Sequence, residues 1–192
     1  KRQDSSFDEA IALTGDDFER VALKAESARD YFLLVGPPGT GKTSRALRRM
    51  VEHFYAASSM QILLLAYTNR AVDEICQSLS SITPCIDYIR VGSELSCDVR
   101  FRGHLLENIL AECNSRREVN IRMADCRVYV GTVASIAAKA ELFKLKRFDV
   151  AIVDEATQIL EPQLLGILCA KFADERNAVG KFILIGDHKQ LP

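Results

Sequence analysis

One stretch of the chain restricts the possible folds more than any other. A short apolar run, Tyr31 to Val35, leads directly into the loop Gly36-Pro37-Pro38-Gly39-Thr40-Gly41-Lys42-Thr43. Apolar residues then recur at helical spacing from Ala46 to Phe54. This order of strand, loop and helix, with the pattern G-x-x-x-x-G-K-[ST] in the loop, is typical of a phosphate-binding loop at the end of a buried strand.

The residue types in this loop suit a polyphosphate. Glycines let backbone N–H groups converge on phosphate oxygens, and the start of a helix adds partial positive charge. We expect Lys42 to reach the β- and γ-phosphates and the Thr43 hydroxyl to bind Mg²⁺. The remaining predicted nucleotide-binding residues lie beside them in the loop and the first helical turn: Gly36, Pro37, Pro38, Gly39, Thr40, Gly41 and Ser44.

A second motif supplies carboxylates. The apolar run Val150 to Val153 continues straight into Asp154 and Glu155. An acidic pair after a strand is most often a solvated strand end, but nucleotide hydrolysis requires such groups beside a phosphate-binding loop. We therefore predict that Asp154 holds the Mg²⁺ shell and that Glu155 orients and deprotonates the attacking water.

The rest of the chain alternates apolar runs with helical patterns, which predicts an α/β fold. Such alternation is typical of a mostly parallel sheet with helices on both faces. We divide the chain into an N-terminal segment, 1–30, with a helix around residues 18–28, and an ATPase domain, 31–192, with a polar helical insertion at 92–125. The predicted strands span residues 31–35, 62–66, 86–91, 127–130, 148–153 and 182–185.

Composition excludes several classes of protein. The chain has 192 residues, of which 48% are hydrophobic and 27% are charged, so it can bury one sizeable core. Its apolar runs are too short to span a bilayer, and none of them follows a charged segment in the pattern of a secretory signal. The 6 cysteines form no Cys-x-x-Cys pair and no zinc spacing with histidine. We expect reduced thiols and an intracellular protein, cytoplasmic or nuclear. A net charge of -1 neither supports nor excludes a nucleic-acid partner.

Two further segments carry sequence motifs. They are Ala66 to Glu74, after the second predicted strand, and Gly186 to Pro192, at the end of the chain. Together with the phosphate loop and the Asp154–Gln158 string, in this order, they resemble the first RecA-like motor domain of superfamily 1 helicases. The resemblance covers roughly residues 19–192. It is greatest to the branch of the nonsense-mediated-decay helicase and senataxin.

The resemblance implies an ATP- and Mg²⁺-dependent motor that moves along single-stranded DNA or RNA. Thr68 and Asn69 would contact the strand backbone, and Gly131 with Thr132 would form a further strand-binding turn. Backbone contacts of this kind do not read sequence. The resemblance also implies a catalytic role for Gln190, as the sensor of the γ-phosphate. It implies coupling roles for Asp187 and Gln158.

One position departs from the family pattern. The family has a glutamine about seventeen residues before the phosphate loop, where it recognises adenine, and ungapped counting places Glu19 there. A carboxylate accepts a hydrogen bond from the adenine amino group but cannot donate one to a ring nitrogen. The nucleotide preference is open at this point.

The resemblance also implies a partner, a second RecA-like domain of the same protein, whose arginine fingers would stabilise the transition state. Because the chain starts at Lys1 and stops inside a motif, we expect a fragment that is nearly inactive alone. The competing hypothesis is a nucleotide-dependent switch or a protein-remodelling ATPase. Strand-stimulated hydrolysis would separate the two.

Overall fold

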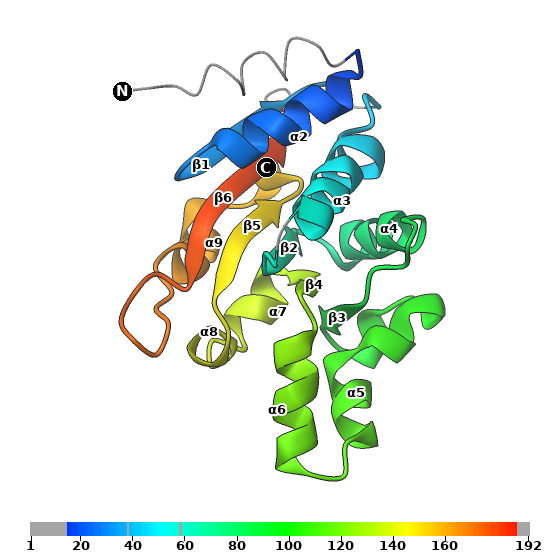
Figure 1. Ribbon diagram of the computed structural model, residues 1–192, viewed down its shortest axis with the longest axis vertical. Helices are drawn as coiled ribbons and strands as arrows, with labels where there is room; N and C mark the ends of the chain where they lie inside the picture. The colour runs from blue at the N-terminus through cyan, green and yellow to red at the C-terminus, as the bar shows by residue number, and fades with distance from the viewer. Residues whose placement is uncertain (1–14, 38, 58, 188–192) are drawn as a thin grey trace.

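The computed structural model of the protein describes residues 15–37, 39–57 and 59–187 (Figure 1). Its strands all pair in parallel and form one sheet in the order β1-β6-β5-β2-β4-β3. Parallel pairing brings the carboxyl ends of the strands to one edge of the sheet, and this edge carries the site described below. The strands are β1 (Tyr31–Val35), β2 (Ile62–Ala66), β3 (Tyr88–Val91), β4 (Val128–Thr132), β5 (Phe148–Val153) and β6 (Val179–Gly186).

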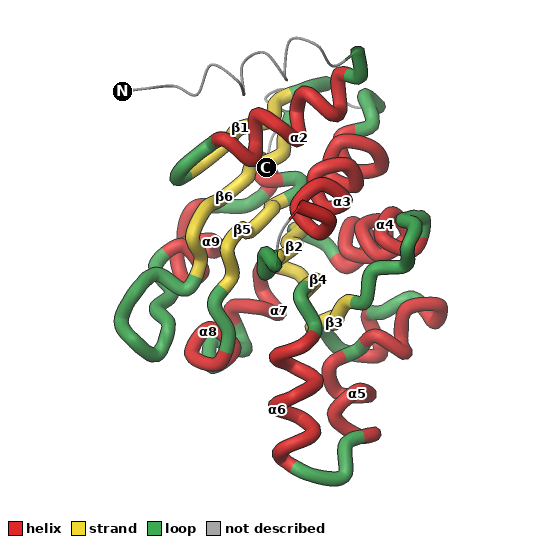
Figure 2. The backbone as a smooth tube through the Cα atoms, viewed as in Figure 1, coloured by secondary structure: helices red, strands yellow, loops and turns green. Residues whose placement is uncertain are grey.

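Helices cover both faces of the sheet (Figure 2). One face packs against α2 (Asp17–Ser27), α3 (Arg48–Ala57) and α4 (Asn69–Ser80). The opposite face packs against α5 (Leu106–Glu112), α7 (Val133–Ala137), α8 (Leu142–Leu145) and α9 (Glu161–Leu168). The shorter turns of helix are η1 (Lys42–Leu47), η2 (Glu94–Ser96), η3 (Val99–His104) and η4 (Ala156–Gln158), and α6 (Arg116–Asp125) completes the set in the described residues.

The central strand β2 shows why the core forms on both sides. Its side chains are fully buried, with Ile62 and Leu64 in the cluster beneath α3 and α4. Leu63 and Leu65 point the other way, into the cluster beneath α7 and α8. A strand that is covered on both faces has a continuous apolar sequence rather than an alternating one. This is why the apolar run at residues 62–66 predicted a strand. The predicted α/β class with a parallel sheet is confirmed.

The edge strand β1 differs from its prediction as a buried strand. Tyr31, Leu33 and Val35 are 67%, 55% and 57% exposed, while Phe32 and Leu34 pack against the core. The reason is that only one face of β1 is covered by the described residues, the face that carries Phe32 and Leu34. Edge position alone does not explain the exposure, because β3 lies at the other edge of the sheet and is buried throughout. An apolar run therefore predicted the strand but not which of its faces is covered.

The polar stretch 92–125 is helical, as predicted, and projects from the body beyond α4 and β3 (Figure 1). It contains η2, η3, α5 and α6. Only α5 was marked by an apolar stripe. None of the residues of α6 is buried, so that helix has no apolar face for a sequence pattern to reveal.

The helix α2 shares the core of the residues that follow it. Ala22 and Ala25 are buried in the cluster that contains α3. The buried Lys181 of β6 donates from Nζ to the carbonyls of Ala25 (2.8 Å) and Glu26 (2.9 Å) at the end of α2. These carbonyls lack helical partners, so a lysine there fastens α2 to the sheet. Within the described residues, none of the helices is long and apolar enough to cross a bilayer.

Candidate functional site

The phosphate loop joins β1 to η1 and is shaped by its own hydrogen bonds. Gly39 and Gly41 have φ values of 76° and 79°, a region that glycine enters without strain. Thr40 Oγ1 donates to the Pro37 carbonyl at 2.9 Å. The Lys42 ammonium donates back to the carbonyls of Gly36 (2.5 Å) and Pro37 (2.6 Å). The loop thus holds the lysine at its centre. Pro38 lies outside the described residues.

The first helical turns after the loop are wider than an α-helix. The amide of Ala46 donates to the Gly41 carbonyl at 3.0 Å, five residues back, and η1 is π-helical over Lys42–Leu47. Short π-helical segments are frequent at functional sites. The apolar residues of this turn, Ala46 and Leu47, are buried as predicted.

The two sequence motifs meet at the carboxyl ends of β1 and β5. Thr43 Oγ1 donates to Asp154 Oδ2 at 2.5 Å, across 111 residues of sequence. Asp154 is 2% exposed, and its other oxygen accepts from the Glu155 amide at 2.9 Å. A hydroxyl and a carboxylate oxygen are hard ligands of the kind that Mg²⁺ prefers, so these residues fit that ion together with phosphate and water. The described residues contain no cluster of three or more His, Cys, Asp or Glu side chains able to hold a metal by themselves.

Burial perturbs both acids of the pair. Loss of solvation raises the pKa of Asp154, and the Thr43 hydrogen bond partly opposes that rise. The pKa of Glu155 is raised by burial first and then by the negative charges of Asp154 and Glu74, while Arg70 lowers it. A carboxylate with a raised pKa is a better proton acceptor near neutral pH than a solvated one.

Glu155 also carries two local signs of functional constraint. Its backbone lies in the left-handed region with φ 52°, a conformation that costs a non-glycine residue on the order of 1 kcal/mol. Its Oε2 atom is buried and has no hydrogen-bond partner among the described residues. An unsatisfied buried acceptor is uncommon and requires a reason. A water molecule does not reach this atom in the structure as it stands, so Oε2 can accept a hydrogen bond from water only after a local rearrangement of the site.

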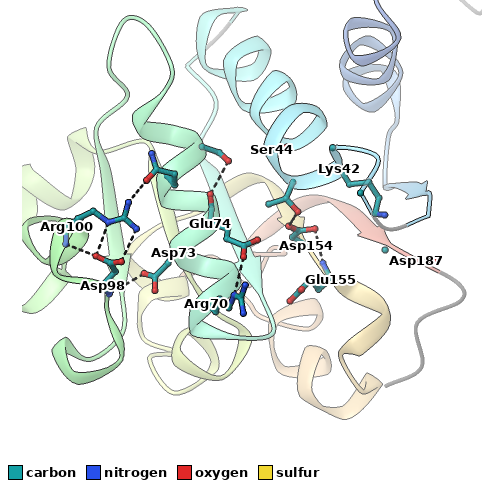
Figure 3. A pocket seen from close by; sticks show the side chains of 16 residues that line it. Lys42, Ser44, Arg70, Asp73, Glu74, Asp98, Arg100, Asp154, Glu155 and Asp187 are labelled. Atoms are coloured by element: carbon teal, nitrogen blue, oxygen red, sulfur yellow. Dashed lines mark hydrogen bonds and ion pairs between the residues drawn. The ribbon is translucent and has the colours of Figure 1, made fainter.

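These residues line a cavity of about 680 Å³ (Figure 3). The phosphate-loop side is formed by Gly39, Gly41, Lys42, Thr43 and Ser44, and the sheet side by Asp154, Glu155, Gly186 and Asp187. The third side is the polar face of α4, and it continues to Asp98 and Arg100 of the insertion. The cavity therefore brings the predicted phosphate, magnesium and water-activating residues together.

Sequence reasoning missed the α4 side of the cavity. The residues concerned recur at helical spacing, as Arg70, Asp73, Glu74 and Gln77. They lie on the face of α4 opposite to its buried residues, which include Ala71, Val72 and Ile75. The sequence signal that could have revealed them is the row of polar residues at helical spacing in the helix that follows β2.

Asp73 anchors the insertion to α4. The guanidinium of Arg90, only 1% exposed on β3, donates to Asp73 Oδ1, and the Asp98 amide reaches the same oxygen at 3.4 Å. Arg100 Nη1 also donates to Gln77 Oε1 at 2.7 Å. Arg100 of the insertion is therefore engaged with both α4 and Asp98.

Glu19 is not part of this cavity. Its Oε2 atom accepts from Arg49 Nε at 2.6 Å, and its Oε1 atom lies 3.7 Å from His53 Nδ1. Both partners belong to α3, so the structure turns Glu19 toward the α2–α3 contact. Ungapped counting from the phosphate loop ignored this helix packing, and adenine recognition by Glu19 stays a prediction.

The predicted strand-contacting residues fall into two groups. Thr68 and Asn69 are exposed at the carboxyl end of β2, where Thr68 Oγ1 caps α4 by accepting from the Ala71 amide at 3.1 Å. Thr132 is buried and caps α7 by accepting from the Ser135 amide at 3.0 Å. Gly131 is buried where an added Cβ would lie 2.9 Å from the Val91 carbonyl. For this second group a direct strand contact would require the turn after β4 to open.

The residues predicted to couple hydrolysis to strand binding, Asp187 and Gln158, lie just after β6 and in η4 after β5. Asp187 is 2% exposed, and its amide donates to Thr157 Oγ1 at 3.4 Å. Gly186 allows this approach, since a Cβ there would meet Thr157 Cγ2 at 2.7 Å. Thr157 was not predicted, and it links η4, which contains Gln158, to the end of β6. Gln190 lies outside the described residues.

Comparisons with known proteins agree with this geometry. The family described as AAA domain matches residues 19–192. The chain is 34% identical over 177 residues to the DNA replication ATP-dependent helicase/nuclease JHS1 of Arabidopsis thaliana, covering 92% of this chain and 12% of that protein. It is 33% identical over 179 residues to DNA2 of Homo sapiens, covering 91% and 15% respectively. The chain thus spans less than a sixth of the length of these relatives.

Solved structures show the same fold at low sequence identity. The UvsW helicase from bacteriophage T4 superposes with a TM-score of 0.56 at 14% identity, covering 94% of this chain and 58% of that one. The Sulfolobus solfataricus SWI2/SNF2 ATPase core, solved in complex with dsDNA, gives 0.58 at 13% identity, covering 88% and 30%. With the phosphate loop, the paired acids and the parallel sheet in place, the chain belongs to the AAA domain family and has the fold of a RecA-like ATPase domain.

Proposed function

We propose that the cavity binds ATP with Mg²⁺, hydrolyses it, and thereby drives movement of the full-length protein along a single strand of nucleic acid. The observation that carries this proposal is the convergence of Lys42, Thr43, Asp154 and Glu155 on one cavity. Four residues of the required types, from motifs more than a hundred positions apart, meet where a triphosphate can lie.

Each residue has a defined task in this proposal. Lys42 gives up its carbonyl contacts with the loop to bind phosphate oxygens, and the loop amides bind the rest. Thr43 and Asp154 would hold Mg²⁺, whose charge would offset that of the phosphates. Glu155, which lines the cavity, orients the attacking water through its carboxylate and accepts the proton that the water loses.

We propose single-stranded DNA as the substrate, because the relatives are named as DNA replication helicase/nucleases. Thr68 and Asn69 support this, since both are exposed at the edge of the sheet that carries the cavity. Gly131 and Thr132 would act only after a local opening. We further propose an intracellular location. A second RecA-like domain of the same protein would close the cavity against Gln190, Asp187 and Gln158.

The test compares two substitutions in the full-length protein. Lys42→Ala should weaken binding of ATP at least tenfold, because it removes the ammonium that binds the phosphates. Glu155→Gln should retain ATP binding but lower turnover a hundredfold or more. The matched control is Glu161→Gln, an exposed glutamate in the first turn of α9 that does not line the cavity. It should leave both quantities unchanged.

The measurements are ATP affinity by calorimetry and phosphate release with and without oligo-dT. Turnover in Glu155→Gln equal to that of the unmodified protein would refute the water-activating assignment. Hydrolysis that no single-stranded DNA or RNA stimulates would instead favour a nucleotide-dependent switch or a protein-remodelling ATPase.

A further inference from the structure

The polar face of α4 contains an exposed ion pair beside the hydrolytic acids. Arg70 Nε lies 3.4 Å from Glu74 Oε1, one helical turn away, and the two side chains are 91% and 58% exposed. Both line the cavity that also contains Asp154 and Glu155 (Figure 3). A long, exposed contact of this kind contributes little free energy, so a competing anion can displace it.

Arg70 also adjoins the proposed strand-binding residues. It directly follows Thr68 and Asn69 at the carboxyl end of β2, and it is the most exposed side chain among the ion pairs of the described residues. A guanidinium binds a phosphate through two parallel hydrogen bonds, which a carboxylate at 3.4 Å from a single nitrogen does not match. Arg70 thus lies beside Glu74 and directly follows the exposed residues Thr68 and Asn69, where a strand phosphate could approach it.

The other charged groups on this face are more firmly held. Asp73 accepts from the buried Arg90, and Arg100 binds both Asp98 and Gln77. Those contacts fasten the insertion to α4, whereas the Arg70–Glu74 contact fastens nothing beyond its own helical turn. Lys42 and Asp187 line the cavity from the phosphate loop and from the end of β6.

We propose that Arg70 leaves Glu74 to bind a phosphate of the single strand, and that this exchange couples strand binding to hydrolysis. The inference rests on the proposed function. When Arg70 moves, the carboxylate of Glu74 is no longer neutralised and adds a negative charge to the cavity that contains Glu155. That charge favours the polarised attacking water. Arg70 is a strand-binding residue in this scheme, and Glu74 is a positioning residue.

The two residues therefore predict different defects. In the full-length protein, Arg70→Gln should remove one phosphate contact and lower the slope of log K against log salt for oligo-dT by about 0.7. It should also reduce the stimulation of ATP turnover by oligo-dT roughly two- to fivefold, the range that exposed charge pairs support. Glu74→Gln should reduce stimulation by the same factor and leave the salt slope unchanged. Arg70→Lys, which keeps the charge, should restore the slope.

The control is Arg176→Gln, an exposed arginine paired with Asp174 in the loop before β6, at the opposite edge of the sheet. It should match the unmodified protein in both measurements. The proposed exchange of Arg70 between Glu74 and a strand phosphate would be refuted by either of two results, and both would leave the proposed function intact. One is full stimulation of ATP turnover by oligo-dT in Glu74→Gln, and the other is an unchanged slope of log K against log salt in Arg70→Gln. If oligo-dT does not stimulate ATP turnover even in the unmodified protein, both the proposed function and this inference are refuted.

Discussion

Breaking the contact between Asp73 and Arg90 should destabilise the domain more than the loss of other ion pairs. Arg90 is 1% exposed, and Asp73 supplies its one short acceptor among the described residues. The remaining contacts are long, at 3.7 Å to Cys76 Sγ and 3.4 Å to the Ser96 carbonyl. Asp73→Ala therefore leaves a buried guanidinium without a counter-charge. Removing one partner of a fully buried pair costs about 3–5 kcal/mol.

The exposure of Asp73 reduces this value. Its side chain is 23% exposed, so water can reach the vacated position, and we expect a loss of about 2–3 kcal/mol in the free energy of unfolding. With a urea m-value of about 2 kcal/mol/M, the midpoint should fall by roughly 1 M. Arg90→Met in the same background removes the unpaired charge and fills the space, so the double variant should recover more than about 1 kcal/mol.

The assay is urea unfolding followed by far-UV circular dichroism. Asp174→Ala, which breaks the exposed pair with Arg176, serves as the control and should leave the midpoint unchanged. An Asp73→Ala midpoint equal to that of the unmodified protein would refute the reasoning. Strict additivity of Asp73→Ala and Arg90→Met would do so as well, because the argument requires the two side chains to act as a pair.

Three further predictions use the same unfolding assay. Gly131→Ala should cost about 2 kcal/mol, because the new Cβ would lie 2.9 Å from the Val91 carbonyl; an unchanged midpoint would contradict this. Glu155→Gly should stabilise the fold by about 1 kcal/mol through relief of the φ 52° strain while turnover is lost, and destabilisation would count against that strain. Burial raises the pKa of the Cys76 thiol from 9.0 to about 11. Because the unfolded thiol then ionises first, the stability that it contributes is present below pH 9 and is lost as pH rises from 9 to 11, by at most about 1.4 kcal/mol per pH unit. Cys76→Ala should make the fall in midpoint over this range shallower, and an unchanged slope would exclude the thiol as its source.

Local patterns were enough to predict residues that line one cavity, among them Thr43, Asp154 and Glu155. The phosphate loop and the Asp154–Glu155 motif each follow an apolar strand, and parallel strands place their carboxyl ends at one edge. Once the class was known, the meeting of Thr43 with Asp154 followed from the topology of the sheet. The four core strands were also visible, because burial on both faces removes the polar residues that would interrupt an apolar run.

The contacts of α4 and α2 could not be predicted in the same way. Whether Glu19 meets a nucleotide or Arg49 depends on how α2 packs on α3, and a count along the chain does not measure that distance. Arg90 gave no local sign that it would be buried, since its partner Asp73 belongs to a different element. Such pairings join residues that are remote in sequence, so no periodic pattern records them.

The sequence by itself predicted the fold class and the phosphate loop, and it supplied the candidates for magnesium binding (Thr43 and Asp154) and for water activation (Glu155), because each depends on short motifs and on strand–helix alternation. The tertiary structure decided that β1 is an edge strand with an exposed face, that α4 and the insertion complete the cavity, and that Arg70 lines the same cavity as the acids, next to the proposed strand contacts Thr68 and Asn69. Those features arise when separate elements pack together, and their free energy comes from burial and from ion pairs that exist only in the folded chain.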